Sequence, residues 1–301
     1  MQRSGKKMKE QINDLVSVII PAFNRQKTIE TAVNSVLSQT YRNFEILVVD
    51  DGSKDKTEEV IKKIQQREPR IKYLKHPTNR GAQAARNTGI HAAKGIWIAF
   101  LDSDDCWLKD SLEMRLQLAR EKQVDVVHSD CFLLKDEKNP MKLFGVPPFE
   151  GFIYENLLKQ PGPVFPSLLV KKNALEKIEY LDEHLKSYQE WDTAIRLSKY
   201  YNFAFYPKPT FIYDCRNSDT ISKDNLRDVQ GYEQIIKKFQ KEILRYAGYT
   251  ALANHYLILS IKYYNLKMNK RCIECFLKSF IIMPFNLNLI FSLMKKIFRS
   301  G

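Results

Sequence analysis

Residues 96–107, IWIAFLDSDDCW, place an uninterrupted apolar run directly before a cluster of carboxylates. The apolar half is short and continuous, which favours a strand that is buried on both faces of a sheet. The acidic half crowds Asp102, Asp104 and Asp105 into four positions, where like charges repel one another. A cation can offset that repulsion where a buried strand opens toward solvent. The stretch therefore predicts a buried strand with an acidic site at its carboxyl end.

Apolar strands alternate with amphipathic helices over the first 130 residues. Strands are predicted at residues 16–20, 45–49, 71–74, 96–101 and 124–128, and helices at 28–37, around Val60, at 82–93 and near 110–121. This alternation is typical of βαβ units, so we expect an α/β protein with a mostly parallel sheet flanked by helices. Ligands of such sheets bind beyond the carboxyl ends of the strands. The polar residues that follow four of the strands are Asn24, Arg25, Asp50, Asp51, Arg80 and the acidic cluster.

Beyond about residue 135 the alternation gives way to a different pattern. Prolines punctuate the chain up to about residue 180, which indicates loops and short strands. The elements predicted after them are a helix at 189–200, short strands at 203–206 and 211–213, and successive helices from about 226, with breaks near Gly248, Asn269 and Pro284. This change in composition predicts a domain boundary near residue 222.

Composition narrows the class of protein. A chain of 301 residues with 44% apolar content can bury a substantial core. Its five scattered cysteines fit a reducing compartment, and the lone pair Cys272 and Cys275 lacks the second ligand pair that a zinc site would need. The N-terminus has no apolar secretion signal, and no stretch is long and apolar enough to predict a transmembrane helix.

Basic charge gathers toward the C-terminus. Residues 223–301 hold 14 Lys and Arg against 5 Asp and Glu, a net +9 of the +13 that the whole chain carries. The final stretch predicts either helices packed on the main domain or an amphipathic helix with Phe291, Leu293 and Ile297 at a membrane interface. We expect peripheral membrane contact through this region, and no nucleic-acid partner, because no recognition motif accompanies the charge.

Two acidic motifs carry the expected chemistry. Asp102 and Asp104 form an Asp-x-Asp pair, and Mg²⁺ is commonly held by one or two carboxylates together with phosphate oxygens. Asp105 could join them or could cap the helix that follows. The sequence from Asp50 to Ser53 is a favourable turn by itself, and a binding role requires Asp51 to project into the crevice. The chain contains no GxGxxG or Walker A loop, so a dinucleotide or P-loop site has no support.

These pieces together resemble the family 2 glycosyltransferases, which have the nucleotide-sugar-binding, Rossmann-like GT-A fold. The matching stretches are VSVIIPAFNR (16–25), VLSQTYRNFEILVVDDGSKDKT (36–57), NRGAQAARNTGI (79–90) and AFLDSDDCW (99–107). The resemblance covers about residues 15–215 and implies a metal-dependent, inverting transfer of a sugar from a nucleotide donor such as a UDP-sugar. The acceptor would be a glycan or a lipid-linked molecule at the cytoplasmic face of the cell membrane, in surface polysaccharide or lipopolysaccharide assembly.

The resemblance also divides the chain. It implies a GT-A domain over residues 15–222, with a nucleotide-sugar half (15–130) and an acceptor half (131–222). A basic N-terminal extension (1–14) precedes this domain, and a basic helical region (223–301) follows it.

A role is implied for each residue that matches the family's motifs. The nucleotide-binding set would be Pro21, Ala22, Phe23, Asp51, Arg80, Arg86, Asp102 and Ser103. Within it, Phe23 could pack beside the base, Asp51 would contact the base, and a structural role is equally open for Arg86. Asp104 would be the principal ligand of Mn²⁺ or Mg²⁺ and would bridge to the diphosphate, with help from Asp102.

The catalytic base of the family is usually an Asp at the start of a helix, directly before Trp. Here Glu190 occupies that place in the stretch QEWD, and Asp192 is the alternative. Two residues along a helix turn through about 200°, so both cannot face the substrate. The register of the match favours Glu190, with Trp191 and Arg196 in structural roles. Because Glu replaces the usual Asp, a nucleotide-sugar-binding partner subunit that has lost catalysis remains the alternative function.

Overall fold

The computed structural model describes residues 14–135, 141–216 and 224–284. The stretch predicted to lie at a membrane interface, with Phe291, Leu293 and Ile297, falls outside the described residues, as does nearly all of the basic N-terminal extension.

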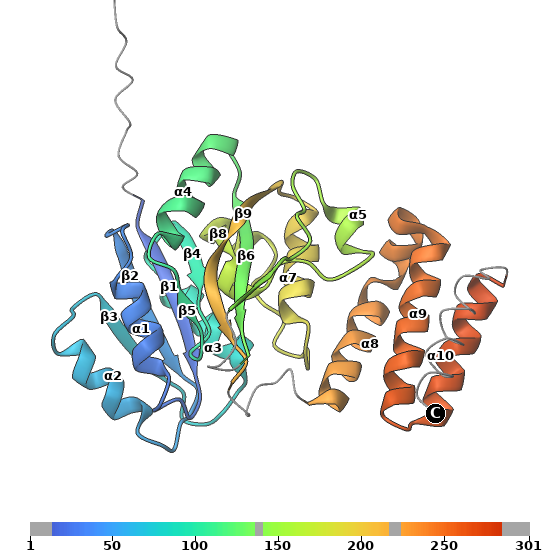
Figure 1. The fold of residues 1–301 in the computed structure, drawn as a ribbon, viewed down its shortest axis with the longest axis horizontal. Helices are drawn as coiled ribbons and strands as arrows, with labels where there is room; N and C mark the ends of the chain where they lie inside the picture. The colour runs from blue at the N-terminus through green and yellow to red at the C-terminus, as the bar shows by residue number, and fades with distance from the viewer. Residues whose placement is uncertain (1–13, 136–140, 217–223, 285–301) are drawn as a thin grey trace, which may run out of the picture.

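Within the described residues, nine strands form one sheet in the order β3-β2-β1-β4-β8-β6-β9-β5, with β7 paired to β6 (Figure 1). The parallel part consists of β1 (Val16–Ala22), β2 (Phe44–Asp50), β3 (Ile71–Lys75) and β4 (Trp97–Phe100). The rest of the sheet consists of β5 (Cys106–Trp107), β6 (Val126–Leu134), β7 (Lys142–Phe144), β8 (Leu169–Lys171) and β9 (Phe203–Asp214). The short β8 runs antiparallel to both of its neighbours, β4 and β6. The sheet is thus mostly parallel at the end that holds the predicted nucleotide motifs.

Helices cover the sheet on both faces. They are α1 (Ile29–Leu37), α2 (Thr57–Gln65), α3 (Ala82–Ala92), α4 (Ser111–Lys122), α5 (Tyr154–Leu157), α6 (Lys172–Lys177) and α7 (Gln189–Ser198). Along β1, Ile19 packs into one apolar cluster while Val18 and Ile20 pack into another. The edge strand β3 is only partly buried, but because successive side chains of a strand point to opposite faces, β1, β2 and β4 are buried on both faces. This explains why these strands are continuous apolar runs in the sequence.

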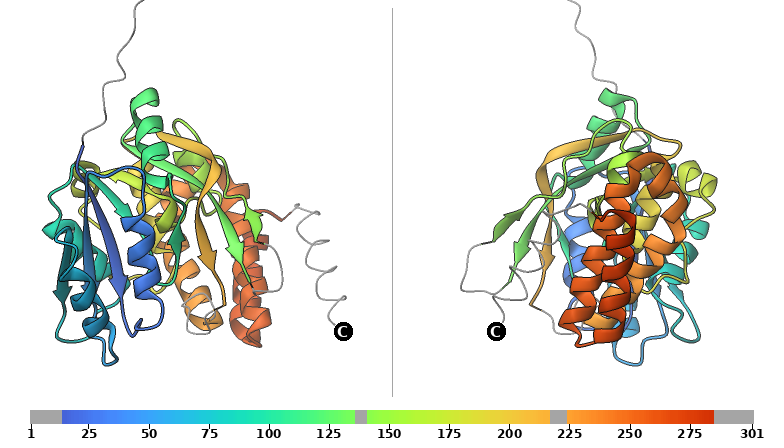
Figure 2. Two further views of the ribbon diagram at one scale, coloured as in Figure 1. Left: turned by 60° about the vertical axis from the view of Figure 1, so that its left-hand side comes forward. Right: turned by 90° about the vertical axis from the view of Figure 1, so that its right-hand side faces the viewer.

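Three further helices stand beside this α/β unit, next to α7 (Figures 1 and 2). They are α8 (Asn225–Glu242), α9 (Gly248–Asn265) and α10 (Asn269–Ile282), with a π-helical turn (Ile243–Ala247) between the first two. Two of the predicted breaks, at Gly248 and Asn269, are helix starts. In the part of the chain that the structure describes, no helix combines the length and apolar character needed to cross a membrane.

The structure corrects one prediction about the sheet. The two short strands expected at 203–206 and 211–213 are a single strand, β9, which pairs in parallel with β6 on both sides of an irregularity. Prolines at 207 and 209 interrupt the apolar pattern between them, and the register shifts opposite Ser129 and Asp130. A bulge of this kind lets a strand continue past residues that cannot donate to the ladder.

We expect Gly95→Ala to weaken the start of β4. An added Cβ would lie 2.6 Å from the carbonyl oxygen of Leu15 and from the amide nitrogen of Ser17, which are backbone atoms. Overpacking of this kind costs about 1–3 kcal/mol, so the free energy of unfolding measured in urea should fall by that amount. Gly145→Ala is the matched control, because its nearest atom would be 3.8 Å away. Equal losses in the two variants would contradict the packing argument.

Candidate active site

The loops that follow β1, β2 and β4 meet at one edge of the sheet. Pro21 and Ala22 are buried at the end of β1, and the ring of Phe23 just beyond them is 39% exposed. The amide of Asp51 donates to the carbonyl oxygen of Ala22 at 2.8 Å, which joins the loop after β2 to the end of β1. The predicted nucleoside-pocket residues therefore lie next to Asp51, with Phe23 accessible to a ligand.

Asp51 holds the segment that leads into α3. Its buried carboxylate accepts hydrogen bonds from the amides of Arg80 at 2.9 Å and Gly81 at 2.7 Å, and lies 2.7 Å from Nδ1 of His76. Sequence analysis did not single out His76, because no motif marks it. A carboxylate offers about four acceptor sites, so one remains for an N–H of a nucleotide base. The base contact of Asp51 stays a prediction.

The neighbouring Asp50 serves the turn itself. It is fully buried and accepts from the amide of Ser53 at 2.8 Å and from the hydroxyl of Tyr73. Directly after the two acids, Gly52 has φ +79°, and a Cβ there would lie 2.8 Å from the carbonyl carbon of Thr78. Only glycine permits this backbone and this close approach.

Arg86 on α3 orients Asp102 on the loop after β4. Its Nη2 donates to the Asp102 carboxylate, and its Nη1 donates to Oε1 of Gln83 at 2.6 Å. The guanidinium lies 4.3 Å above the ring of Phe165, which closes it from the other side. The structure thus gives Arg86 a clear structural contact with a predicted ligand-binding carboxylate, and Ser103 is buried directly beside that carboxylate.

The other two acids of the cluster are less well compensated. Asp104 lies 3.7 Å from Nη2 of Arg25, which follows β1; burial and the charge of Asp102 nevertheless raise the pKa of the Asp104 carboxyl. Asp105 is 1% exposed and accepts from the amide of Asp214 at 3.0 Å. Burial, followed by the charge of Asp102, raises the pKa of Asp105 well above its usual range. Helix capping does not explain these acids, because α4 begins at Ser111 with Asp110 as its N-cap residue.

The donor set suits a hard divalent cation that shares its ligands with a phosphate. Among the described residues, no group of three or more His, Cys, Asp or Glu side chains is arranged to hold a metal ion. Mg²⁺, however, is typically held by only one or two carboxylates plus substrate oxygens and water. In the same loop, Oδ2 of the buried Asp105 has no hydrogen-bond partner within the described residues. Asp102 and Asp104 supply the two carboxylates that such a site requires, and their role as ligands stays a prediction.

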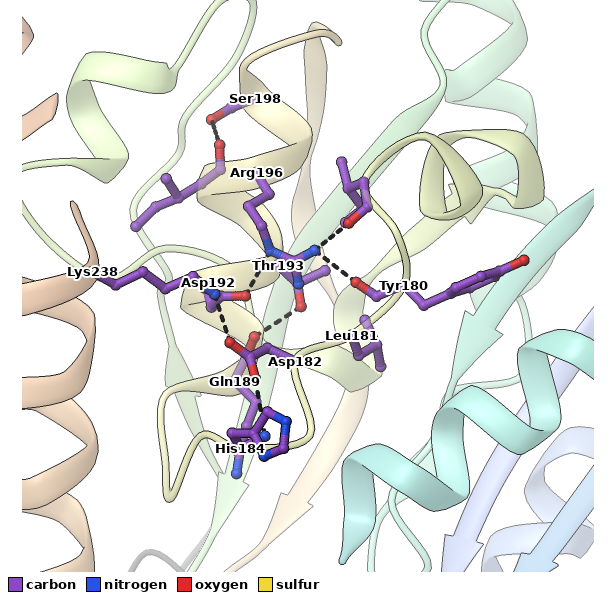
Figure 3. A network of polar contacts seen from close by, with 12 residues as sticks. Tyr180, Leu181, Asp182, His184, Gln189, Asp192, Thr193, Arg196, Ser198 and Lys238 are labelled. Carbon is purple, nitrogen blue, oxygen red and sulfur yellow. Dashed lines mark hydrogen bonds and ion pairs between the residues drawn. The ribbon is translucent and has the colours of Figure 1, made fainter.

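Glu190 and Asp192 lie in very different surroundings on α7. Glu190 is half-buried in the first turn; burial raises the pKa of its carboxyl, Arg86 lowers it and Asp102 raises it. Glu190 is thus within electrostatic range of the acidic loop. Asp192 is fully buried and paired with Nε of Arg196 at 2.7 Å and with Nζ of Lys238 at 2.6 Å (Figure 3). The charges of Arg86 and Asp102 thus act on Glu190, whereas Asp192 lies inside a network of ion pairs; the choice of base stays a prediction.

Glu183 is a further polar residue at this edge that no sequence motif revealed. It accepts from Nδ2 of Asn87 at 2.8 Å and lies 3.4 Å from Nη2 of the exposed Arg80. Asn87 also donates to the carbonyl oxygen of Leu181, so this loop is tied to α3. Arg80 and Arg86 therefore both lie at this edge of the sheet; Arg80 is exposed and Arg86 is buried.

Relatives of known class match this chain along the segment that builds the site. Residues 17–178, more than half of the chain, match the family described as Glycosyl transferase family 2. The chain is 34% identical over 177 residues to UDP-Glc:alpha-D-GlcNAc-diphosphoundecaprenol beta-1,3-glucosyltransferase WfgD of Escherichia coli, across 59% of this chain and 68% of that protein. It is 37% identical over 145 residues to the putative teichuronic acid biosynthesis glycosyltransferase TuaG of Bacillus subtilis, across 48% of this chain and 57% of that protein.

Solved structures show the same fold. S. aureus TarS 1-349 in complex with UDP-GlcNAc superposes with a TM-score of 0.62 at 18% identity, covering 87% of this chain and 89% of that one. The mannosyltransferase PcManGT from Pyrobaculum calidifontis, in complex with GDP-Man and Mn²⁺, superposes with a TM-score of 0.62 at 18% identity, covering 95% and 80%. The expected GT-A fold is therefore confirmed. The chain belongs to glycosyl transferase family 2.

Asp51→Ala should loosen the segment that leads into α3. The amides of Arg80 and Gly81 would lose their acceptor, and a hydrogen bond to a charged group contributes about 1.5–3 kcal/mol. Hydrogen exchange at these two amides should accelerate by about 10-fold or more relative to the wild type. Glu59→Ala, at an exposed position on α2, is the control and should leave both rates unchanged. Wild-type exchange in Asp51→Ala would refute the anchoring role.

Proposed function

We propose that this protein transfers a sugar from a nucleotide donor, in the first instance a UDP-sugar, to a lipid-linked or glycan acceptor with inversion of the anomeric centre. The observation that carries the proposal is that Glu190 lies within electrostatic range of Arg86 and Asp102, and that Asp104 lies within range of Asp102. A base candidate and a metal-ligand pair thus share one edge of the sheet. The names of WfgD and TuaG, which describe a diphosphoundecaprenol acceptor and teichuronic acid biosynthesis, support surface polysaccharide assembly as the setting.

Each residue at the edge has a part in this chemistry. Pro21, Ala22, Phe23 and Asp51 would hold the nucleoside, and Arg80, Arg86 and Ser103 would flank the nucleotide. Asp104 and Asp102 would hold Mn²⁺ or Mg²⁺. The bound ion would offset the charge that develops on the departing diphosphate. Glu190 would take the proton of the acceptor hydroxyl as that oxygen attacks the anomeric carbon, a contribution of about 10²- to 10⁴-fold.

The proposed division of labour follows the chain. Residues 15–130 would bind the nucleotide sugar, residues 131–222 would receive the acceptor, and the basic C-terminal region (223–301) would support them. A catalytically impaired binding subunit is the second candidate, because Glu stands where the family usually has Asp. Its longer side chain changes the reach by about 1 Å, a scale on which misplacement matters.

Turnover with a panel of UDP-sugars and Mn²⁺ tests the proposal directly. We expect release of UDP with at least one donor when a lipid-linked acceptor is present, and loss of that release on chelation with EDTA. Glu190→Gln should lower kcat by about 10²- to 10⁴-fold while the donor still binds. Nucleotide binding by calorimetry without release from any donor would support the binding subunit instead. Abolished turnover in Asp192→Asn alongside normal turnover in Glu190→Gln would show that the base is misassigned.

The pH dependence provides an internal check on the same variant. A general base works only when deprotonated, and burial raises the pKa of the Glu190 carboxyl above the ordinary 4.5. As the pH falls, kcat/KM should therefore begin to decrease at a pH above that value, because the protonated carboxyl cannot accept a proton. This decrease is the acidic limb of the pH profile. Glu190→Gln should remove this limb from the residual activity, whereas Glu155→Gln on the exposed part of α5 should retain it.

We also propose that the C-terminal helices make the peripheral membrane contact that a lipid-linked acceptor requires, at the inner face of the cell membrane. Exposed apolar side chains line one stripe of α10, namely Ile273, Leu277, Phe280 and Ile281, with exposed fractions from 44% to 76%. Their spacing places them on one helical face. Basic residues of the same region would meet anionic headgroups.

Flotation with vesicles tests the membrane contact. The full chain should float with vesicles that mix phosphatidylglycerol and phosphatidylcholine, and binding should weaken as salt is raised. Leu277→Ser combined with Ile281→Ser should reduce the floated fraction. Ile96→Ser, which removes a side chain that is 52% exposed on the α/β unit, is the matched control. Undiminished flotation of the double variant would exclude α10 as the contact.

A further inference from the structure

A cation from the C-terminal helices neutralises a buried acid in the first turns of α7. Asp192 is fully buried, and Nζ of Lys238 on α8 lies 2.6 Å from its Oδ1. The same ammonium group lies 2.7 Å from Oδ2 of Asp182, in the loop before α7 (Figure 3). A buried carboxylate that loses its partner destabilises a protein strongly. Arg196 on α7 is the other partner of Asp192, at 2.7 Å, so Lys238 is the cation that ties this acid, and with it α7, to a helix outside the α/β unit.

The segment that leads into α7 is held largely by α8. The main chain of Lys186 donates to Oε1 of Gln234 at 3.0 Å and accepts from Nε of Arg227 at 2.6 Å. Nε2 of Gln234 also donates to the carbonyl oxygen of His184 at 3.2 Å. These contacts fix the backbone of 184–186 against one face of α8, immediately before the turn that carries Glu190.

The backbones of the two elements touch at Gly231. A Cβ at this position would lie 2.6 Å from the amide nitrogen and 2.9 Å from the Cα of Ser187. The next residue, Tyr188, has φ +58° at the start of α7, and its ring packs edge-on against Trp191 and Tyr232. A left-handed residue at the helix start persists only where its surroundings determine it. Here α8 supplies those surroundings.

The loop before α7 reaches the nucleotide side of the site at its other end. Nη1 of Arg196 donates to the carbonyl oxygens of Ile178 and Tyr180. The carbonyl oxygen of Leu181 accepts a hydrogen bond from Asn87, the residue that follows Arg86 on α3. Residues 178–188 thus span from α3 to α8. A shift of α8 would move Glu190 relative to Arg86 and the acidic loop.

We propose that Lys238 is a positioning residue for glycosyl transfer, and that α8 sets the place of Glu190 through the Lys238–Asp192 pair and the Gly231–Ser187 contact. The proposal rests on the proposed function, in which Glu190 is the base. Lys238 touches neither donor nor acceptor and acts through Asp192 and α7. A displacement of about 1 Å in a reacting group can cost about 10²-fold in rate. The helical C-terminal region is then part of the catalytic apparatus rather than an appendage.

The test separates positioning from binding and from folding. In the full chain, Lys238→Met should lower kcat by about 10- to 10²-fold and leave the KM of the donor unchanged, because the nucleotide residues lie on other elements. Lys238→Arg should recover most of the lost kcat, since it restores a cation at Asp192. Lys237→Met is the matched control. Lys237 lies next to Lys238 on α8 and, within the described part of the chain, forms its ion pair with Glu233. The kcat of this variant should match the wild type.

Gly231→Ala keeps every charge and tests the Gly231–Ser187 contact. This variant should also have a lower kcat and an unchanged KM for the donor. Circular dichroism and thermal unfolding establish that each variant is folded, and Gly231→Ala decides the question if Lys238→Met does not fold. Wild-type kcat in the folded variants would overturn the proposal. Loss of folding in both variants would also overturn it, and so would parallel changes in kcat and KM. In either case α8 would contribute to stability alone.

The outcome is distinguishable from failure of the proposed function. If the wild-type protein releases no UDP from any donor, the glycosyltransferase proposal itself fails. If the wild type turns over, Glu190→Gln is impaired and Lys238→Met is not, only the positioning role of Lys238 fails.

Discussion

The parallel register of β1 between β2 and β4 is the constraint on which the site depends. Ala22 pairs with Asp50 and Ile19 pairs with Phe100, so the acidic loops after β2 and β4 leave the sheet at the same edge. Both faces of these strands are buried, and polar side chains are therefore confined to the strand ends. The same apolar runs that stabilise the sheet thus gather Asp51, Asp102 and Asp104 in one place.

The buried acids around this edge differ in how their charge is compensated. Asp51 accepts from two backbone amides, Asp102 from Arg86, and Asp192 accepts from Arg196 and forms an ion pair with Lys238. Asp104 and Asp105 are the exceptions, since burial raises the pKa of both. Charge is least compensated at these two residues, which is where a divalent cation and a diphosphate would contribute most. Asp104, next to the Arg86-bound Asp102, is therefore the proposed ligand whose charge leaves most for a bound cation to offset.

Much of the candidate site could be predicted from the sequence, for local reasons. Strands β1 to β4 are short apolar runs followed by polar loops, so pattern alone locates both the sheet and its ligand edge. The prediction of two strands in place of β9 was wrong, because a pairwise ladder with β6 overrides the local interruption by prolines. The suggestion that Asp105 caps a helix was also wrong, since its partner is the amide of Asp214, far along the chain.

The choice between Glu190 and Asp192 shows where sequence and structure divide. By itself the sequence determined that these two side chains point in different directions, because helical periodicity is a local property. It also determined the order of strands and acidic loops along the chain. Only the tertiary structure shows that Asp192 is enclosed by ion pairs, because one partner is Lys238, 46 positions further along the chain. Long-range pairing of charges in a low-dielectric interior leaves no local pattern in the sequence.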